Sequence, residues 1–153
     1  MRSQTNWVLA GLLILGGCAD QNKTATLEDL YTREVKMPGG ARFRAEVVTS
    51  KFDMSRGMMF RDTLAPDRGM LFVHGEPSKY PYWMYQVRIP LDLIWLDQNR
   101  LITEIVANAE PCKSESAVKC PQIGGNRRAL FVLELNAGMA EKHKLKLGDR
   151  LDF

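Results

Sequence analysis

The sequence predicts a mainly β domain, a compact sandwich or partly closed barrel of six to eight strands with two short helices. Short apolar runs rich in aromatic and β-branched residues alternate with tight turns, which is typical of strands. Apolar and polar residues also alternate around the turn Pro38-Gly39-Gly40. The 153-residue chain is long enough for one hydrophobic core and too short for two ordinary domains.

The first predicted element is a hairpin. Val35 and Met37 precede the Pro-Gly turn, and apolar Phe43, Ala45 and Val47 follow it, each next to a charged residue. This period of two predicts paired strands with one solvated face.

A short helix is predicted after the hairpin. Ser50 can cap a helix that begins at Lys51, because an acid, Asp53, stands three residues later. Gly57 weakens or bends this helix.

The remaining elements follow from the same patterns. Apolar segments between turns predict strands at residues 70–73, 82–85, 91–96, 101–106 and 129–135. Asn136 is a candidate cap for a second helix through residues 139–143, and a last strand should end at Phe153.

The N-terminus has the anatomy of an export signal. Residues 1–17 contain a basic residue, a short apolar core and small residues before Cys18, and this ending resembles a bacterial lipobox. We expect residues 1–17 to be a lipoprotein signal peptide, residues 18–29 a flexible tether with lipidated Cys18, and residues 30–153 one β-rich domain. The alternative is an ordinary signal or anchor in which Cys18 is incidental.

Localisation follows from the lipidated cysteine. Ala19, rather than Asp, follows Cys18, which by resemblance to Gram-negative sorting rules predicts the periplasmic face of the outer membrane. The expected partner is therefore a lipid membrane. The 21 basic and 18 acidic side chains nearly balance, so nucleic acid is not an expected partner.

Two cysteines remain for a disulfide. Cys112 and Cys120 flank a polar loop, and an oxidising compartment permits them to pair. Such a bridge should stabilise the fold by roughly 2.5 kcal/mol. A zinc site is the alternative, but His74 and His143 lie in unrelated segments, so no metal site is expected.

Several ordered blocks resemble the bacterial and archaeal domain of unknown function 192 family. The blocks are Arg56-Gly57-Met58-Met59-Phe60-Arg61, Gly69-Met70-Leu71-Phe72-Val73, Tyr82-Trp83-Met84, Ile89-Pro90-Leu91-Asp92, Val132-Leu133-Glu134-Leu135-Asn136-Ala137-Gly138 and Leu147-Gly148-Asp149. The resemblance covers about residues 32–153 and implies a small jelly-roll or sandwich fold, often exported, without an established activity. Tyr85-Gln86-Val87 stands where Lys-Asn-Thr is usual, so a site lined by those residues would be altered here.

Two carboxylates are the main catalytic candidates. Asp92 and Glu134 both interrupt apolar strands, and an unpaired buried charge is expensive. The favoured interpretation is a structural ion pair of either carboxylate with Arg56 or Arg61. The alternative is that Asp92 and Glu134 converge as acid and base on a sugar or ester.

Aromatic residues suggest a binding surface. Of the cluster around residues 80–95, Trp83 and Trp95 are expected in the core, whereas Tyr80 and Tyr85 are better surface candidates. The predicted ligand-binding residues are Arg56, Arg61, Tyr80, Trp83, Tyr85 and Asp92.

Methionines offer a third hypothesis. Thioethers select Cu(I), so a copper site with His74 is the alternative, and core packing is the favoured role of these side chains. The methionines concerned are Met54, Met58, Met59, Met70 and Met84.

The expected function is therefore an envelope lipoprotein of unknown molecular activity. Its β domain should act as a binding or accessory module for a small-molecule, glycan or protein ligand, without a cofactor. An enzyme acting on envelope glycans and a Cu(I)-binding protein are the alternatives, and no nucleophile elbow or phosphate loop favours another enzyme class.

Overall fold

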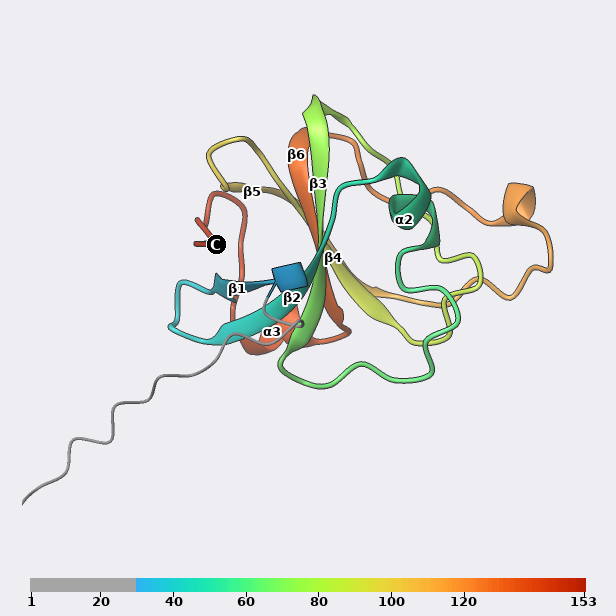
Figure 1. Cartoon of the computed structure of the whole chain (residues 1–153), viewed down its shortest axis with the longest axis horizontal. Coiled ribbons are helices and arrows are strands. Elements are labelled where there is room, and N and C mark those ends of the chain that lie inside the picture. The colour runs from blue at the N-terminus through green and yellow to red at the C-terminus, as the bar shows by residue number, and fades with distance from the viewer. Residues whose placement is uncertain (1–29) are drawn as a thin grey trace, which may run out of the picture.

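A computed structural model describes residues 30–153 and confirms a mainly β fold with two short helices. Six strands form one mixed sheet in the order β1-β2-β3-β6-β4-β5, which is not closed into a barrel (Figure 1). The strands are β1 (Thr32–Lys36), β2 (Arg42–Val48), β3 (Arg68–Lys79), β4 (Leu91–Leu96), β5 (Ile102–Ala109) and β6 (Arg128–Asn136). The predicted signal peptide, Cys18 and the tether lie outside the described residues.

Both faces of the sheet are buried at its central strands, which fits a partly closed, sandwich-like fold. One core contains Phe72, Leu93 and Trp95, and lies on the side of α2. The other contains Leu133 and Leu135. In Figure 1, α2 lies to the right of β3, whereas β1 and the C-terminus lie to the left. Because strand side chains alternate, each central strand supplies both cores.

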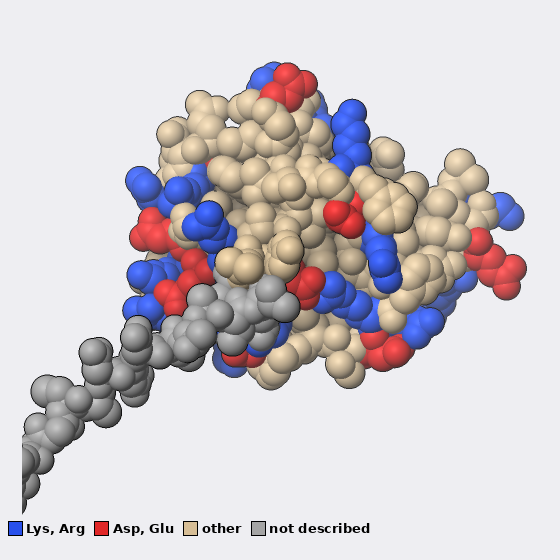
Figure 2. Space-filling model, in the orientation of Figure 1, with Lys and Arg blue, Asp and Glu red and all other residues tan. Residues whose placement is uncertain are grey.

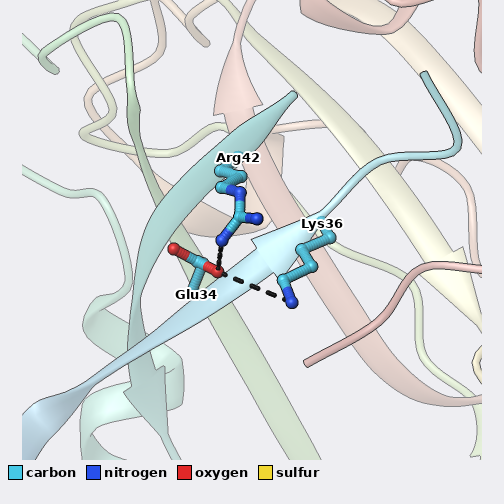
Figure 3. A network of polar contacts seen from close by, with 3 residues as sticks. All are labelled: Glu34, Lys36 and Arg42. Carbon is cyan, nitrogen blue, oxygen red and sulfur yellow. Dashed lines mark hydrogen bonds and ion pairs between the residues drawn. The ribbon is translucent and has the colours of Figure 1, made fainter. Parts of the chain in front are cut away.

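The predicted hairpin of β1 and β2 is confirmed. Its strands pair antiparallel, and the turn is closed by the amide of Met37, which donates to the carbonyl of Ala41 over 2.8 Å. On the solvated face, Glu34 lies between Arg42 and Lys36, at 2.7 and 4.0 Å (Figure 3). These side chains are at least half exposed, so the ion pairs add little stability.

The connection from β2 to β3 carries helix α2 (Lys51–Arg56). The two strands are parallel, and a parallel pair requires a crossover connection. Ser50 caps the helix as predicted, since its side chain accepts a hydrogen bond from the amide of Asp53 at 3.1 Å. The helix ends at Gly57, which has a positive φ of 44°.

Two predicted strands are wrong. Residues 82–85 and residues 147–153 form only isolated bridges to other segments. The first segment is held by Tyr82 pairing with Ile123 and by Tyr85 pairing with Cys112. Its aromatic content serves side-chain packing, because β-propensity largely reports burial of large side chains rather than a backbone preference.

The second helix, α3 (Met139–Lys142), is capped differently from the prediction. Gly138 occupies the cap position, whereas the Asn136 side chain donates to the carbonyls of Leu64 and Ala65. The cap acceptor comes from β4: Asp92 accepts hydrogen bonds from the amides of Gly138 and Ala140 at 3.1 and 2.7 Å. A third hydrogen bond comes from the Asn108 amide at 2.8 Å.

The predicted disulfide is present. Cys112 and Cys120 are joined, and the Cys112 amide also donates to the carbonyl of Met84 at 3.0 Å. The short 3₁₀ helix η1 (Ala117–Lys119) lies within the bridged loop. Across residues 30–153, no helix has the length and apolar character that a membrane crossing requires.

The role of Asp92 predicts a large loss of stability in Asp92→Ala. The substitution leaves three backbone amides without their acceptor, of which the amide of Ala140 is in a buried hydrogen bond and the other two are in part-buried ones, and a buried unpaired amide costs about 1–3 kcal/mol. We expect the free energy of unfolding, measured by urea denaturation, to fall by about 3 kcal/mol or more. The matched control is Asp62→Ala, which removes an exposed ion pair with Arg88 and should change stability by less than about 1 kcal/mol. Equal losses in the two variants would contradict this role of Asp92.

Candidate functional site

A cavity of about 310 Å³ opens beside α2, between this helix and the sheet. Its apolar lining includes Met54 of α2, Met59 of the segment after α2, and Phe72 of β3. The segment after β3 supplies Tyr82 and Trp83. Most of the lining is therefore apolar or aromatic, as is usual for small-molecule sites.

Glu134 of β6 lines this cavity from within the core. It lies opposite Met70 of β3 and Leu93 of β4, and residues directly opposite share a face. The Glu134 side chain thus belongs to the face that α2 covers, while its neighbours Leu133 and Leu135 belong to the other core. The strand period forces a carboxyl group into an apolar environment.

The carboxyl group of Glu134 lacks a complete set of partners. Glu134 is 5% exposed, and Oε2 is the one buried side-chain oxygen or nitrogen among the described residues without a hydrogen bond. Burial raises the pKa of Glu134 to about 8, and the charge of Arg61 opposes this shift only in part. A buried, unpartnered group with a perturbed pKa in a cavity is a candidate functional residue.

An aromatic cluster forms the wall beside Glu134. The hydroxyl of Tyr82 and Nε2 of His74 are hydrogen-bonded at 3.2 Å, and the His74 ring stacks on Tyr80 with centroids 3.5 Å apart. Burial raises the pKa of Tyr82 well above its ordinary value and lowers the pKa of His74. Both side chains are therefore neutral near pH 7, and this wall brings no cation to Glu134.

The arginines near the cavity are engaged elsewhere or stand at its mouth. Arg61 forms a two-point ion pair with Glu46, at 2.5 and 2.7 Å, and these hydrogen bonds lower the pKa of Glu46. Arg56, at the end of α2, lines the cavity, is exposed, and forms no ion pair with another residue of the described chain. Basic and acidic side chains are interspersed over the face drawn in Figure 2.

Both predictions for the two carboxylates are wrong. Neither Asp92 nor Glu134 is hydrogen-bonded to an arginine, because Asp92 binds backbone amides and Arg61 binds Glu46. They also cannot act together in one cleft. Asp92 lies opposite Leu135, on the other face of the sheet from Glu134.

The predicted ligand-binding residues divide into two groups. Arg56, Tyr80 and Trp83 line the cavity. Arg61, Tyr85 and Asp92 do not: Arg61 lines a neighbouring depression, the Tyr85 hydroxyl donates to the carbonyl of Glu115, and Asp92 is fully buried.

The two tryptophans also differ. Trp95 is fully buried as predicted and donates from Nε1 to the carbonyl of Tyr80, whereas Trp83 is 39% exposed, so its expected place in the core is wrong.

Some cavity residues had no signal in the sequence. Gln122 follows the disulfide loop and lines the cavity, in a segment whose Gly124 lies against the ring of Trp95. Gly124, with φ of 59°, permits this approach, since a Cβ there would collide with the Trp95 ring. Val87 also lines the cavity, so one position of the altered Tyr85-Gln86-Val87 segment belongs to the site.

The proposed copper ligands are divided between core and cavity. Met58, Met70 and Met84 are buried in the core, as their packing role predicts. Met54, Met59 and His74 line the cavity, where His74 Nε2 is already bonded to Tyr82.

The raised pKa of Glu134 predicts a pH-dependent stability. As the pH rises, the carboxyl group of the unfolded chain loses its proton near its ordinary pKa of 4.5, whereas the folded protein keeps this proton up to about pH 8. The contribution of Glu134 to the free energy of unfolding is therefore complete below pH 4.5 and decreases as the pH rises to about 8. Glu134→Gln removes the titrating group. Its melting temperature should rise relative to the wild type as the pH increases from about 5 to 8, and the difference should then stay constant. A difference that does not vary with pH, measured by calorimetry, would show that Glu134 has an ordinary pKa.

Comparison with known proteins identifies the fold and the family. A protein of unknown function from Novosphingobium aromaticivorans DSM 12444 has a similar structure, with a TM-score of 0.70 and 30% identity over 80% of this chain and 84% of that one. A candidate transcription regulator from Sinorhizobium meliloti 1021 gives a TM-score of 0.68 and 31% identity over 78% and 89%. No match was found among curated proteins. The family DUF192, described as "Uncharacterized ACR", matches residues 34–153, and the chain therefore belongs to the DUF192 family.

Proposed function

We propose that this protein is a lipid-anchored envelope protein whose β domain binds a small molecule in the cavity beside α2. One observation carries the binding role: Glu134, whose buried Oε2 has no hydrogen-bond partner among residues 30–153, lines a cavity of about 310 Å³. A buried polar atom without a partner destabilises a fold, so a ligand that supplies the missing hydrogen bond would gain binding energy.

The size of the cavity favours a small ligand. Ligand sites are typically about 300–1,000 Å³, and this cavity lies at the lower end of that range. The apolar wall of Met54, Met59 and Phe72 would contact the body of the ligand, and Glu134 would fix its orientation. This supports a compact molecule rather than a glycan polymer or a protein surface.

Binding is favoured over the glycan-hydrolysing alternative. That reaction was predicted to use Asp92 and Glu134 as a pair, and the two lie on opposite faces of the sheet. Cu(I) binding stays a prediction from the sequence, and the cavity restricts its possible ligands to Met54, Met59 and His74.

The envelope location rests on the sequence. The lipobox-like segment before Cys18 supports export and acylation, and the expected destination is the periplasmic face of the outer membrane. The Cys112–Cys120 disulfide supports an oxidising compartment.

Binding in the cavity is tested with a substitution that fills it. Ser55 is exposed on α2 and lines the cavity, so Ser55→Trp should obstruct the entrance without disturbing the core. We expect at least one of the probes indole, phenol, benzylamine and benzoate to shift the amide resonances of Gly57 and Trp83 in the wild type but not in Ser55→Trp. Lys51→Trp adds the same ring to the same helix, outside the lining residues, and should bind as the wild type does. The binding role fails if no probe shifts these resonances.

Acylation is tested by metabolic labelling. The full chain expressed in a Gram-negative host should incorporate an alkyne analogue of palmitate and fractionate with the outer membrane. Cys18→Ser, which removes the acceptor sulfur, should be unlabelled. An unlabelled wild type, or labelling that persists in Cys18→Ser, rules out lipidation at this residue.

A further inference from the structure

We propose that the ligand of this cavity is an organic monoamine, bound as its ammonium ion with Glu134 as the counter-ion. The inference rests on the proposed function, since it specifies the chemistry of a ligand for the same site.

The first argument is the kind of partner that Glu134 needs. An ionised carboxylate only accepts hydrogen bonds, and Oε2 has none. Neighbouring groups do not donate to it: His74 and Tyr82 are bonded to each other, and both nitrogens of the Arg61 fork contact Glu46. Among residues 30–153 no group donates to Oε2, so we assign the missing donor to a ligand in the cavity that Glu134 lines.

The second argument is charge. When Glu134 ionises, its negative charge lies in a low-dielectric environment, where a cation in contact with it is bound far more strongly than in water. The rings of Tyr82 and Trp83 also line the cavity, and aromatic faces attract ammonium groups. A neutral ligand would leave Glu134 protonated near pH 7, whereas an ammonium ion compensates the charge of the ionised carboxylate.

The third argument concerns the rest of the ligand. Beyond the carboxylate the lining is largely apolar, with Met54, Met59 and Phe72 available to contact a hydrocarbon or aryl group. Arg56 stands at the mouth with its positive charge. A second ammonium group would be repelled there, which favours a monoamine over a polyamine.

The number of protons released on binding is a measurable property of this site. The titratable and charged groups that line the cavity with Glu134 are His74 on β3, Tyr80 and Tyr82 after it, and Arg56 at the end of α2. The charge of Arg61 also acts on Glu134 from outside the lining. The pKa of Glu134 near 8 means that the empty site is mostly protonated at pH 7. Binding an ammonium ion then converts the carboxylic acid to a carboxylate, and the displaced proton goes to the solvent.

The test is calorimetric titration of the full chain with benzylamine, benzyl alcohol and benzoate. Titrations at pH 7 in phosphate and in HEPES, which differ in ionisation enthalpy and contain no primary amine, count the protons released. Benzylamine should bind best, with release of close to one proton, and its affinity should rise up to about tenfold per pH unit below pH 8. Glu134→Gln should weaken benzylamine binding by at least about tenfold. Glu76→Gln, an exposed control outside the cavity lining, should leave it unchanged.

The outcomes separate this inference from the proposed function. If benzyl alcohol or benzoate binds in the cavity as tightly as benzylamine, the amine specificity is wrong, while the binding role stands. If benzylamine binds equally to the wild type and to Glu134→Gln, Glu134 is not the counter-ion. If none of these three probes, nor indole or phenol, binds, the proposed function itself fails.

Discussion

The alternation of side chains along β6 is the constraint on which the rest of the structure depends. β6 is hydrogen-bonded to β3 on one side and to β4 on the other, and both of its faces are buried. Leu133 and Leu135 must fill one core, so the residue between them must enter the other. Because that residue is Glu134, the fold places a carboxyl group where an aliphatic side chain would give more stability.

Removing a charged carboxylate from water is unfavourable, and three carboxyl groups of this fold differ in how that unfavourable free energy is offset. Asp92 is fully buried and is satisfied by three backbone amides, so it joins β4 to the start of α3. Glu46 is partly exposed and forms an ion pair with Arg61. Within residues 30–153, Glu134 has neither backbone amide donors nor a hydrogen-bonded arginine, and its pKa is raised as a result of burial. The first two are structural, and the third is open to a ligand.

Sequence reasoning predicts the fold well where local signals decide it. The β1–β2 hairpin, the Ser50 cap and the disulfide each depend on residues close in sequence. Sequence reasoning fails where contacts between segments far apart in the sequence determine the structure. Asn136 looks like a helix cap, but the acceptor for α3 comes from Asp92 on another strand, and residue type alone cannot show that. The two carboxylates of β4 and β6 were recognised as unusual, yet their opposite faces depend on a strand register that one sequence does not reveal.

The parallel pairing of β2 with β3 has an evolutionary consequence. Parallel neighbours cannot be joined by a tight turn, so the chain must travel across the sheet between them, and this excursion supplies the α2 side of the cavity. The excursion is held to the rest of the domain by buried Met58 and by the Asn136 side chain, which donates to the carbonyls of Leu64 and Ala65, whereas α2 itself has no buried residue. Surface positions tolerate changes in composition. Ligand preference can therefore diverge among proteins with this fold through substitutions on the exposed helix, while the six strands keep their packing.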